Sequence, residues 1–193
     1  FLNGRYDGTY ELCEKLKISD HRVAAGDDGF LLEVDSRAPE EDDSRYFYSY
    51  SLEYPINIKE PENEINDANY NYIVDYIDKV DFALYGPYFT DPAKGWQAYL
   101  DLDSFVDWYL INEIAKNEDA FQAECYMNMK KSGKLRMGPL WTAEKSFGFE
   151  KSGYSGFVVK NTKWYNRLFQ DPAFVAKVKE RFNYFYDHQQ DII

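Results

Sequence analysis

The chain has 193 residues, of which 45% are hydrophobic and 19% aromatic, so its composition excludes general disorder and supports one domain or two small lobes. A formal net charge of −12 repels phosphate backbones, and nucleic acid is therefore not an expected partner. The sequence contains no apolar run of about eighteen residues, so it predicts no transmembrane segment.

The first third of the chain has the alternating pattern of β-strands. "RYDGTYELCEKLKI" (residues 5–18) alternates, and "GFLLEVD" (29–35) is a compact apolar run. A tyrosine-rich acidic stretch then has the two-residue period of a strand over residues 46–54. The side chains expected on one face are those of Tyr46, Tyr48, Tyr50, Leu52 and Tyr54. Such a face is either covered by the following helix, which we prefer, or exposed as a platform for stacking sugars.

From Asn66 the period becomes helical, behind an Asn66-Asp67 cap and up to Gly86-Pro87. A second helix is predicted from residues 101–103 to about Asn117. "CYMNMKKSGKLRMGPLW" (125–141) reads as two short strands joined at Ser132-Gly133. The last helix begins with Asp171 as N-cap and Pro172 at its first position. This order predicts an α+β fold, with strands in residues 1–65 and a mainly helical part in residues 66–193.

The chemistry is concentrated where the second helix ends and the hairpin follows. The helix ends near Asn117 and Asp119, and the second hairpin strand continues into "GPLWTAEKSFG" (138–148). The helix end and the strand end should therefore meet at one rim. Protein kinases have this order: a loop with a catalytic Asp, a hairpin, and a strand that ends in a metal-binding Asp before Phe-Gly. Helix–hairpin–turn is a common pattern, so the order alone indicates little.

Five motifs in order give the chain a resemblance to the CotH family, the kinase-like proteins named after spore coat protein H. They are "NGRYDGTYELCEKLKISDHRV", "DDGFLLEVD", "SFVDWYLINEIAKNEDAF", "GPLWTAEKSFG" and "WYNRLFQDPAFVAKVKERF". The resemblance runs nearly end to end. It implies a protein-kinase-like fold in which N-terminal strands precede a helical lobe with a catalytic-loop hairpin. It also suggests that the chain is a fragment of a larger bacterial member.

The resemblance implies roles for several acidic residues. Asp119 falls at the catalytic-loop aspartate, with Asn117 and Glu113 supporting it. Glu14 and Glu33 match acidic positions on the strands at the nucleotide side. On strands, however, such carboxylates are also common as exposed surface groups.

The sequence departs from the family pattern at the metal. Thr142 stands where the family has a metal-binding Asp, and a neutral hydroxyl is a poor ligand for Mg²⁺. Glu144 lies on the same side of the strand as Thr142, and Glu124 falls where kinases have a metal-binding Asn. A metal site built from Asp119, Glu124 and Glu144 is one interpretation, and a site that has lost its metal is the other, which we slightly prefer.

The basic residue that would contact the nucleotide has no match in the sequence. Lys15 and Lys17 lie near the expected place but fit no motif. Cys13 and Cys125 lie far apart without metal-ligand spacing, and we interpret them as small apolar residues rather than a disulfide.

Three functional hypotheses follow. The first is an atypical protein kinase that uses ATP with Mg²⁺ or Mn²⁺ and phosphorylates Ser or Thr of a protein substrate. The second is a pseudokinase, without a cofactor, that serves as an assembly module at the cell surface. The third is a glycan-binding module that stacks sugars on the tyrosine-rich strand or on tryptophans, although Trp108 and Trp141 have apolar neighbours and are expected in the core. The resemblance and the processed-looking start favour an extracytoplasmic bacterial protein.

Overall fold

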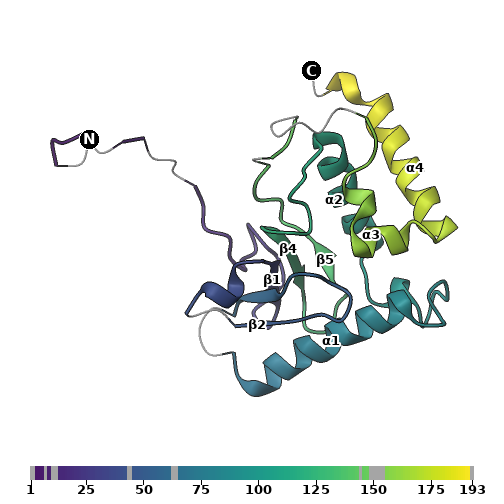
Figure 1. Cartoon of the computed structure of the whole chain (residues 1–193), viewed down its shortest axis with the longest axis horizontal. Helices are drawn as coiled ribbons and strands as arrows, with labels where there is room; N and C mark the ends of the chain where they lie inside the picture. The colour runs from purple at the N-terminus through teal and green to yellow at the C-terminus, as the bar shows by residue number, and fades with distance from the viewer. Residues whose placement is uncertain are drawn as a thin grey trace.

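The computed structural model describes residues 3–6, 8–9, 13–42, 45–61, 65–143, 145–147 and 155–191. At its centre lies a five-stranded antiparallel sheet with the strand order β2-β3-β1-β4-β5 (Figure 1). The strands are β1 (Phe30–Val34), β2 (Tyr46–Phe47), β3 (Ile56–Glu60), β4 (Cys125–Met129) and β5 (Arg136–Met137). The α+β class and the hairpin across Ser132-Gly133 are thereby confirmed. Both predicted parts of the chain, residues 1–65 and 66–193, contribute strands to this one sheet. The division into two parts therefore stays a prediction.

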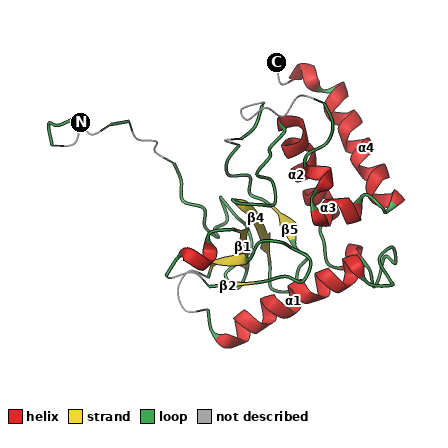
Figure 2. Ribbon diagram, viewed as in Figure 1, coloured by secondary structure: helices red, strands yellow, loops and turns green. Residues whose placement is uncertain are grey.

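Four α-helices accompany the sheet: α1 (Asp67–Tyr85), α2 (Leu102–Ala115), α3 (Lys163–Leu168) and α4 (Pro172–Asp187). Short 3₁₀ turns occur at Ala38–Glu40, Trp96–Ala98, Val159–Asn161 and Gln189–Asp191. Figure 2 shows α1 running along the sheet and α2, α3 and α4 grouped to one side of it. The described helices are therefore arranged around a single central sheet.

The helix boundaries follow from capping residues that the sequence displays. The Asn66 side chain accepts a hydrogen bond from the Asn69 amide (2.9 Å), and α1 ends at Gly86. Asp101 caps α2 through the Ser104 amide (2.9 Å), and Asp171 caps α4 through the Ala173 amide (2.8 Å). All three predicted helices are confirmed. The six-residue helix α3 was not predicted, because it is too short to display a helical period.

The two faces of the sheet differ in chemistry. One face is apolar and joins the main core with α1 and α2; its residues are Phe30, Leu32, Val34, Ile56, Ile58, Cys125, Met127 and Met129. The opposite face carries Glu33, whose cross-strand neighbours are Asn57 and Tyr126. Val23 and Ala25 pack over part of this second face. Glu33, Asn57 and Tyr126 are buried on this face, whereas the side chain of Lys59, which pairs with Glu33, remains 37% exposed.

A buried polar network joins three distant segments of the chain. Asp81 of α1 accepts hydrogen bonds from the hydroxyls of Ser49 (2.6 Å) and Ser51. The indole N–H of Trp164, in α3, donates to the Ser51 hydroxyl at 2.7 Å. Because each buried polar group has a partner, the network carries no uncompensated desolvation cost.

The structure corrects two expectations about strands. The described part of residues 5–18 forms no strand; Ile18 and Ser19 make isolated bridges with Val23, and the N-terminal segment extends away from the body (Figure 1). An alternating pattern produces a strand only where a neighbouring strand supplies hydrogen bonds, and there is none here among the described residues.

The tyrosine-rich stretch is a strand only at Tyr46–Phe47. Beyond it the chain turns so that Ser49 and Ser51 reach Asp81, and this leaves the tyrosines between them facing water. Tyr48 is 61% exposed and Tyr50 90% exposed, so the preferred interpretation of a covered face is wrong for both.

Two smaller expectations concern the membrane and the cysteines. Across the described part of the chain, no helix combines the length and apolar character that crossing a bilayer requires. Cys125 is buried and Cys13 exposed, and neither is in a disulfide. The apolar interpretation is therefore confirmed for Cys125 and wrong for Cys13.

Candidate active site

The C-terminal end of α2 positions the predicted catalytic loop. Lys116 ends the helix in the left-handed conformation (φ 56°), and its amide hydrogen-bonds the Asn112 and Glu113 carbonyls. The Asn117 side-chain amide donates to Asn112 Oδ1 at 2.8 Å, and Asn117 Oδ1 accepts from the Asp119 amide at 3.2 Å. Asn117 is buried and fixes the loop from inside. Its contacts are those of a positioning residue rather than of a group that touches a substrate.

Asp119 lies at the rim and pairs with a lysine from the "TAEKSFG" segment. Its carboxylate is 3.1 Å from Lys145 Nζ, and both side chains are partly exposed. Two backbone bonds hold this segment at the helix end, from Phe147 N to the Ala115 carbonyl (2.6 Å) and from Glu118 N to the Lys145 carbonyl (3.5 Å). The helix end and the strand end thus meet, as the order of elements predicts.

Glu124 and Thr142 are the second pair at this rim. Glu124 precedes β4 in the left-handed conformation (φ 55°), and the Thr142 hydroxyl donates a hydrogen bond to Glu124 Oε2. Asp119, Glu124 and Thr142 all border one small hollow of about 10 Å³, the rim hollow, which is large enough for about one water molecule. Asn117 borders it as well, so the structure brings together four of the predicted site residues.

Glu33 lies beside this rim on the polar face of the sheet. It is buried and forms an ion pair with Lys59 Nζ at 3.3 Å. Burial raises the pKa of Glu33 above its ordinary value, and this effect outweighs Lys59 and the Tyr126 hydroxyl, which both favour the ionised form. Burial also raises the pKa of Tyr126, and the charges of Glu33 and then Glu124 raise it further, so Tyr126 stays a neutral donor between the two carboxylates.

Glu14 is placed elsewhere. Its exposed carboxylate pairs with Arg22 at 3.9 Å, and no contact among the described residues joins it to Glu33. Glu144 lies outside the described residues. Glu14 therefore does not lie with Glu33, and the role of Glu144 stays a prediction.

Whether a divalent ion can bind at the rim depends on the oxygen atoms that the rim residues offer as ligands. Carboxylate and hydroxyl oxygens are the ligand type that Mg²⁺ prefers. However, Asp119 is engaged by Lys145 and Glu124 by Thr142, and the described residues contain no group of three or more acidic, His or Cys side chains that could hold a metal. The described residues thus do not complete an ion site, and no chemical step is assigned to a metal below.

Two lysines that pair with predicted site residues, Lys59 and Lys145, were not identified from the sequence. Lys59 alternates with Asn57 in "INIKE", and this period of two could have placed it on the face of Glu33. Lys145 lies inside the quoted "TAEKSFG" segment, but its pairing with Asp119 depends on how the chain returns to the end of α2. Lys15 and Lys17, the lysines named from the sequence, are partly or fully exposed and precede the sheet.

Comparison with known proteins places the chain in a family. The sequence model of the CotH family, described as "CotH kinase protein", matches residues 1–189. Neither the curated proteins nor the solved structures include a match. Because the family match covers nearly the whole chain, the chain belongs to the CotH family.

Proposed function

We propose that the chain is a kinase-like domain that transfers the γ-phosphoryl group of ATP to a Ser or Thr hydroxyl of a protein. The observation that carries the proposal is the Asp119–Lys145 pair at 3.1 Å, held where the end of α2 meets the "TAEKSFG" segment. A carboxylate that can accept a proton and an ammonium that can neutralise a phosphoryl group are the two charges this reaction needs.

The roles of the two side chains follow from the chemistry. The acceptor oxygen forms a bond to the γ-phosphorus, and the bond between that phosphorus and the β,γ-bridging oxygen breaks. The hydroxyl proton passes to an Asp119 Oδ atom, and ADP leaves with the bridging oxygen. Lys145 would turn from Asp119 toward the transferred group, whose charge it neutralises. Asn117 keeps the Asp119 backbone in place during this exchange.

The Glu33–Lys59 pair supports a nucleotide on the polar face of the sheet. Protein kinases hold the ATP phosphates with a strand lysine that is itself oriented by a glutamate. Lys59 has this surrounding: its Nζ is 3.3 Å from the buried Glu33, while its side chain remains 37% exposed. We assign Lys59 to the phosphates in preference to Lys15 and Lys17.

A non-catalytic role is the second candidate, and the rim itself favours it. Both carboxylates of the rim hollow already have partners, and its volume of about 10 Å³ holds no nucleotide. A pseudokinase that assembles with a protein at the cell surface would need neither ATP nor a metal. The CotH family is named after a spore coat protein, which supports a surface location for either candidate.

The glycan hypothesis has less support. Trp96, Trp108 and Trp164 are buried, so they offer no stacking surface. Trp141 is 36% exposed, which corrects the expectation that it lies in the core, and Tyr50 is the most exposed aromatic side chain among those described. These rings are single exposed groups on different segments rather than a described platform.

Calorimetric titration with ATP, with and without Mg²⁺ or Mn²⁺, separates the first two candidates when it is followed by a transfer assay with radiolabelled ATP. The expected result is nucleotide binding by the wild type and a transfer rate that falls about 10²–10⁴-fold in Asp119→Asn. Asp78→Asn, on the exposed side of α1, is the matched control and should keep the wild-type rate. A folded protein that binds no nucleotide, or whose transfer survives in Asp119→Asn, would contradict the proposal.

A further inference from the structure

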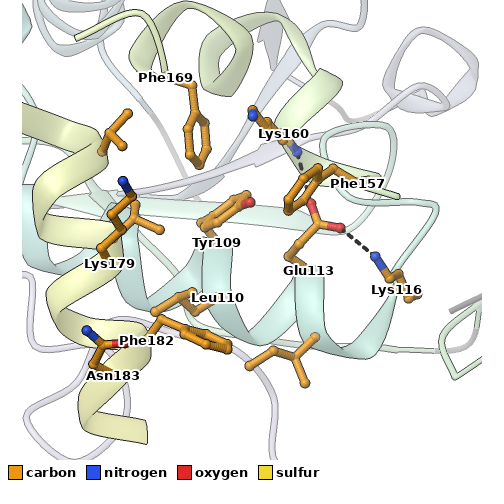
Figure 3. Close-up of a pocket in the computed structure, with 13 residues that line it drawn as sticks. Tyr109, Leu110, Glu113, Lys116, Phe157, Lys160, Phe169, Lys179, Phe182 and Asn183 are labelled. Carbon is orange, nitrogen blue, oxygen red and sulfur yellow. Dashed lines mark hydrogen bonds and ion pairs between the residues drawn. The ribbon is translucent and has the colours of Figure 1, made fainter. Parts of the chain in front are cut away.

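A large apolar cavity, the α2–α4 cavity, lies on the other side of α2 from the rim hollow. It has a volume of about 570 Å³, within the roughly 300–1,000 Å³ range of small-molecule sites. α2 and α4 form two walls, and residues from 157 to 169 close the third (Figure 3). Its apolar lining includes Leu110, Ile114, Phe157, Val175, Val178 and Phe182.

The apolar lining is left open to water. Ile114 and Phe157 are each 57% exposed and Phe182 is 45% exposed, although each borders the cavity. Exposed apolar surface that is gathered in a hollow is typical of a binding site rather than of an ordinary solvated surface. A ligand with an apolar chain would remove these three side chains from water.

The charges around the cavity are predominantly positive. Lys116, Lys160 and Lys179 border it, and the single acidic residue of its lining is Glu113. Glu113 is already compensated, because it pairs with Lys116 Nζ at 3.2 Å and accepts hydrogen bonds from the Val158 and Lys160 amides at 2.8 and 3.1 Å. Within the described chain, the ammonium groups of Lys160 and Lys179 have no carboxylate partner.

Lys160 and Lys179 flank one end of the cavity. Figure 3 shows them on either side of Phe169, and Lys160 Nζ lies 5.0 Å from the centre of that ring. In a protein with a net charge of −12, two lysines without acidic partners beside an apolar hollow form a local site for an anion. Their position fixes where a charged head group would lie.

Tyr109 adds a polar group inside the cavity. Its side chain is buried and its ring packs against Phe169 at 4.9 Å, but its hydroxyl makes no hydrogen bond to the residues that the structure describes. Burial raises the pKa of Tyr109, with the Glu113 charge as a smaller cause, so the phenol remains protonated. Because this hydroxyl borders the cavity and makes no bond to the described residues, it can donate a hydrogen bond to a ligand oxygen.

We propose that the α2–α4 cavity binds a small amphiphilic anion, a monocarboxylate with an unbranched apolar chain. Its chain would lie against Leu110, Val175, Val178 and Phe182, and its carboxylate would be bound by Lys160 and Lys179, with Tyr109 as a further donor. This site is independent of the rim hollow and of phosphoryl transfer.

The charge pattern favours this occupant over two others. A second copy of the chain also carries a net charge of −12, so the two copies repel each other. A membrane surface would need a broad basic face, whereas the net charge of the chain is negative and the lysines surround one concave hollow. Both occupants are outcomes that the experiment distinguishes.

Calorimetric titration of the full chain with decanoate, below its micellar concentration, tests the proposal, and decan-1-ol is the uncharged probe of equal chain length. The expected result is one binding site for decanoate, and decan-1-ol should bind roughly tenfold more weakly because it cannot pair with the lysines. Anionic phosphatidylglycerol vesicles and sedimentation of the free protein form the two remaining arms. Sedimentation with vesicles in the absence of decanoate binding, or dimerisation that fills the cavity, would overturn the proposal.

Variants locate the site. The double change Lys160→Gln/Lys179→Gln should weaken decanoate binding by roughly tenfold or more, and Val175→Trp should abolish it by filling the cavity. Lys130→Gln/Lys134→Gln removes the same charge at a distant position and should leave the affinity unchanged. Decanoate affinity that is equal in both double variants would show a non-specific charge effect and would refute the assigned site. Thermal melts confirm that each variant is folded.

Discussion

Helix α2 separates two hollows that differ in size and in the pairing of their charges. The rim hollow measures about 10 Å³, and both carboxylates that border it, Asp119 and Glu124, have side-chain partners. The α2–α4 cavity measures about 570 Å³, and Lys160 and Lys179 have no carboxylate partner among the described residues. A hollow whose charges are paired internally needs a rearrangement before it accepts a ligand, whereas a hollow with unpaired charges is already prepared for one.

The largest expected effect on stability comes from Glu113, which borders the α2–α4 cavity. Glu113→Ala removes the partner of Lys116 and of two backbone amides, and it should lower the free energy of unfolding by about 3–5 kcal/mol, as is typical when one member of a buried ion pair is removed. Chemical denaturation measures this change. The loss should affect the α2–α4 cavity directly, because Glu113 ties residues 158–160 to α2.

Glu113→Gln is the control for this variant. The amide oxygen can still accept one backbone hydrogen bond, so the loss should be smaller than in Glu113→Ala. If Glu113→Ala cost less than about 1 kcal/mol, the value of an ordinary exposed pair, Glu113 would not be what holds residues 158–160 to α2.

An intermediate loss of stability is expected on changing Thr142, which borders the rim hollow but not the α2–α4 cavity. Thr142→Asp replaces a hydroxyl donor to Glu124 with a second carboxylate, and it should cost about 1–2 kcal/mol in the absence of metal. Mg²⁺ should then raise the melting temperature of the variant, because two facing carboxylates supply ligands that the wild type lacks. Thermal melts with and without Mg²⁺ check this, and Thr142→Asn is the neutral control of similar shape.

The variant also tests whether the two hollows are separate. Its decanoate affinity should equal that of the wild type, since Thr142 does not border the α2–α4 cavity. If Mg²⁺ did not raise the melting temperature of Thr142→Asp, the lack of a carboxylate at residue 142 would not be what prevents metal binding at the rim.

The smallest effect is expected at Glu33, because burial and the attraction of Lys59 oppose each other there. The folded state raises the pKa of Glu33 above its ordinary value of 4.5, so the folded chain binds the proton more tightly than the unfolded chain. The stability that Glu33 contributes is therefore complete below pH 4.5 and is lost as the pH rises through the raised pKa.

Melting curves at several pH values test this sign. The stability of the wild type relative to Glu33→Gln should fall as the pH rises above 4.5 and become constant at higher pH. Lys59→Gln removes the opposing attraction and should enlarge the pH-dependent loss. A relative stability that rises with pH instead would mean that Lys59, rather than burial, dominates at Glu33.

The predictable parts of the molecule were those that local chemistry determines. Asn66, Asp101 and Asp171 are caps that can be recognised in the sequence, and the apolar strand at Phe30–Val34 needs no distant partner to be identified. The meeting of Asp119 with the "TAEKSFG" segment also followed from the order of helix and hairpin.

The parts that escaped prediction depend on distant segments. Alternation over residues 5–18 predicts a strand, but pairing requires a neighbour, and the described residues there have none. Tyr48 and Tyr50 face water because Ser49 and Ser51 bond to Asp81, 30 or more residues away. Lys145 and Lys59 pair with carboxylates that come near them only when the chain folds, so the local sequence does not predict these ion pairs.

The network around Asp81 has a consequence for how the domain loses its structure. One carboxylate is shared by α1 and the loop after β2, and Trp164 joins the same loop across a separation of 113 residues. Opening α3 alone would break the hydrogen bond from the Trp164 indole to Ser51 and would expose the fully buried Trp164 ring to water, so partial unfolding at this point is costly. Residues 49–51, α1 and α3 are thereby coupled into one cooperative unit, and the fluorescence of Trp164 at their junction can report on its unfolding.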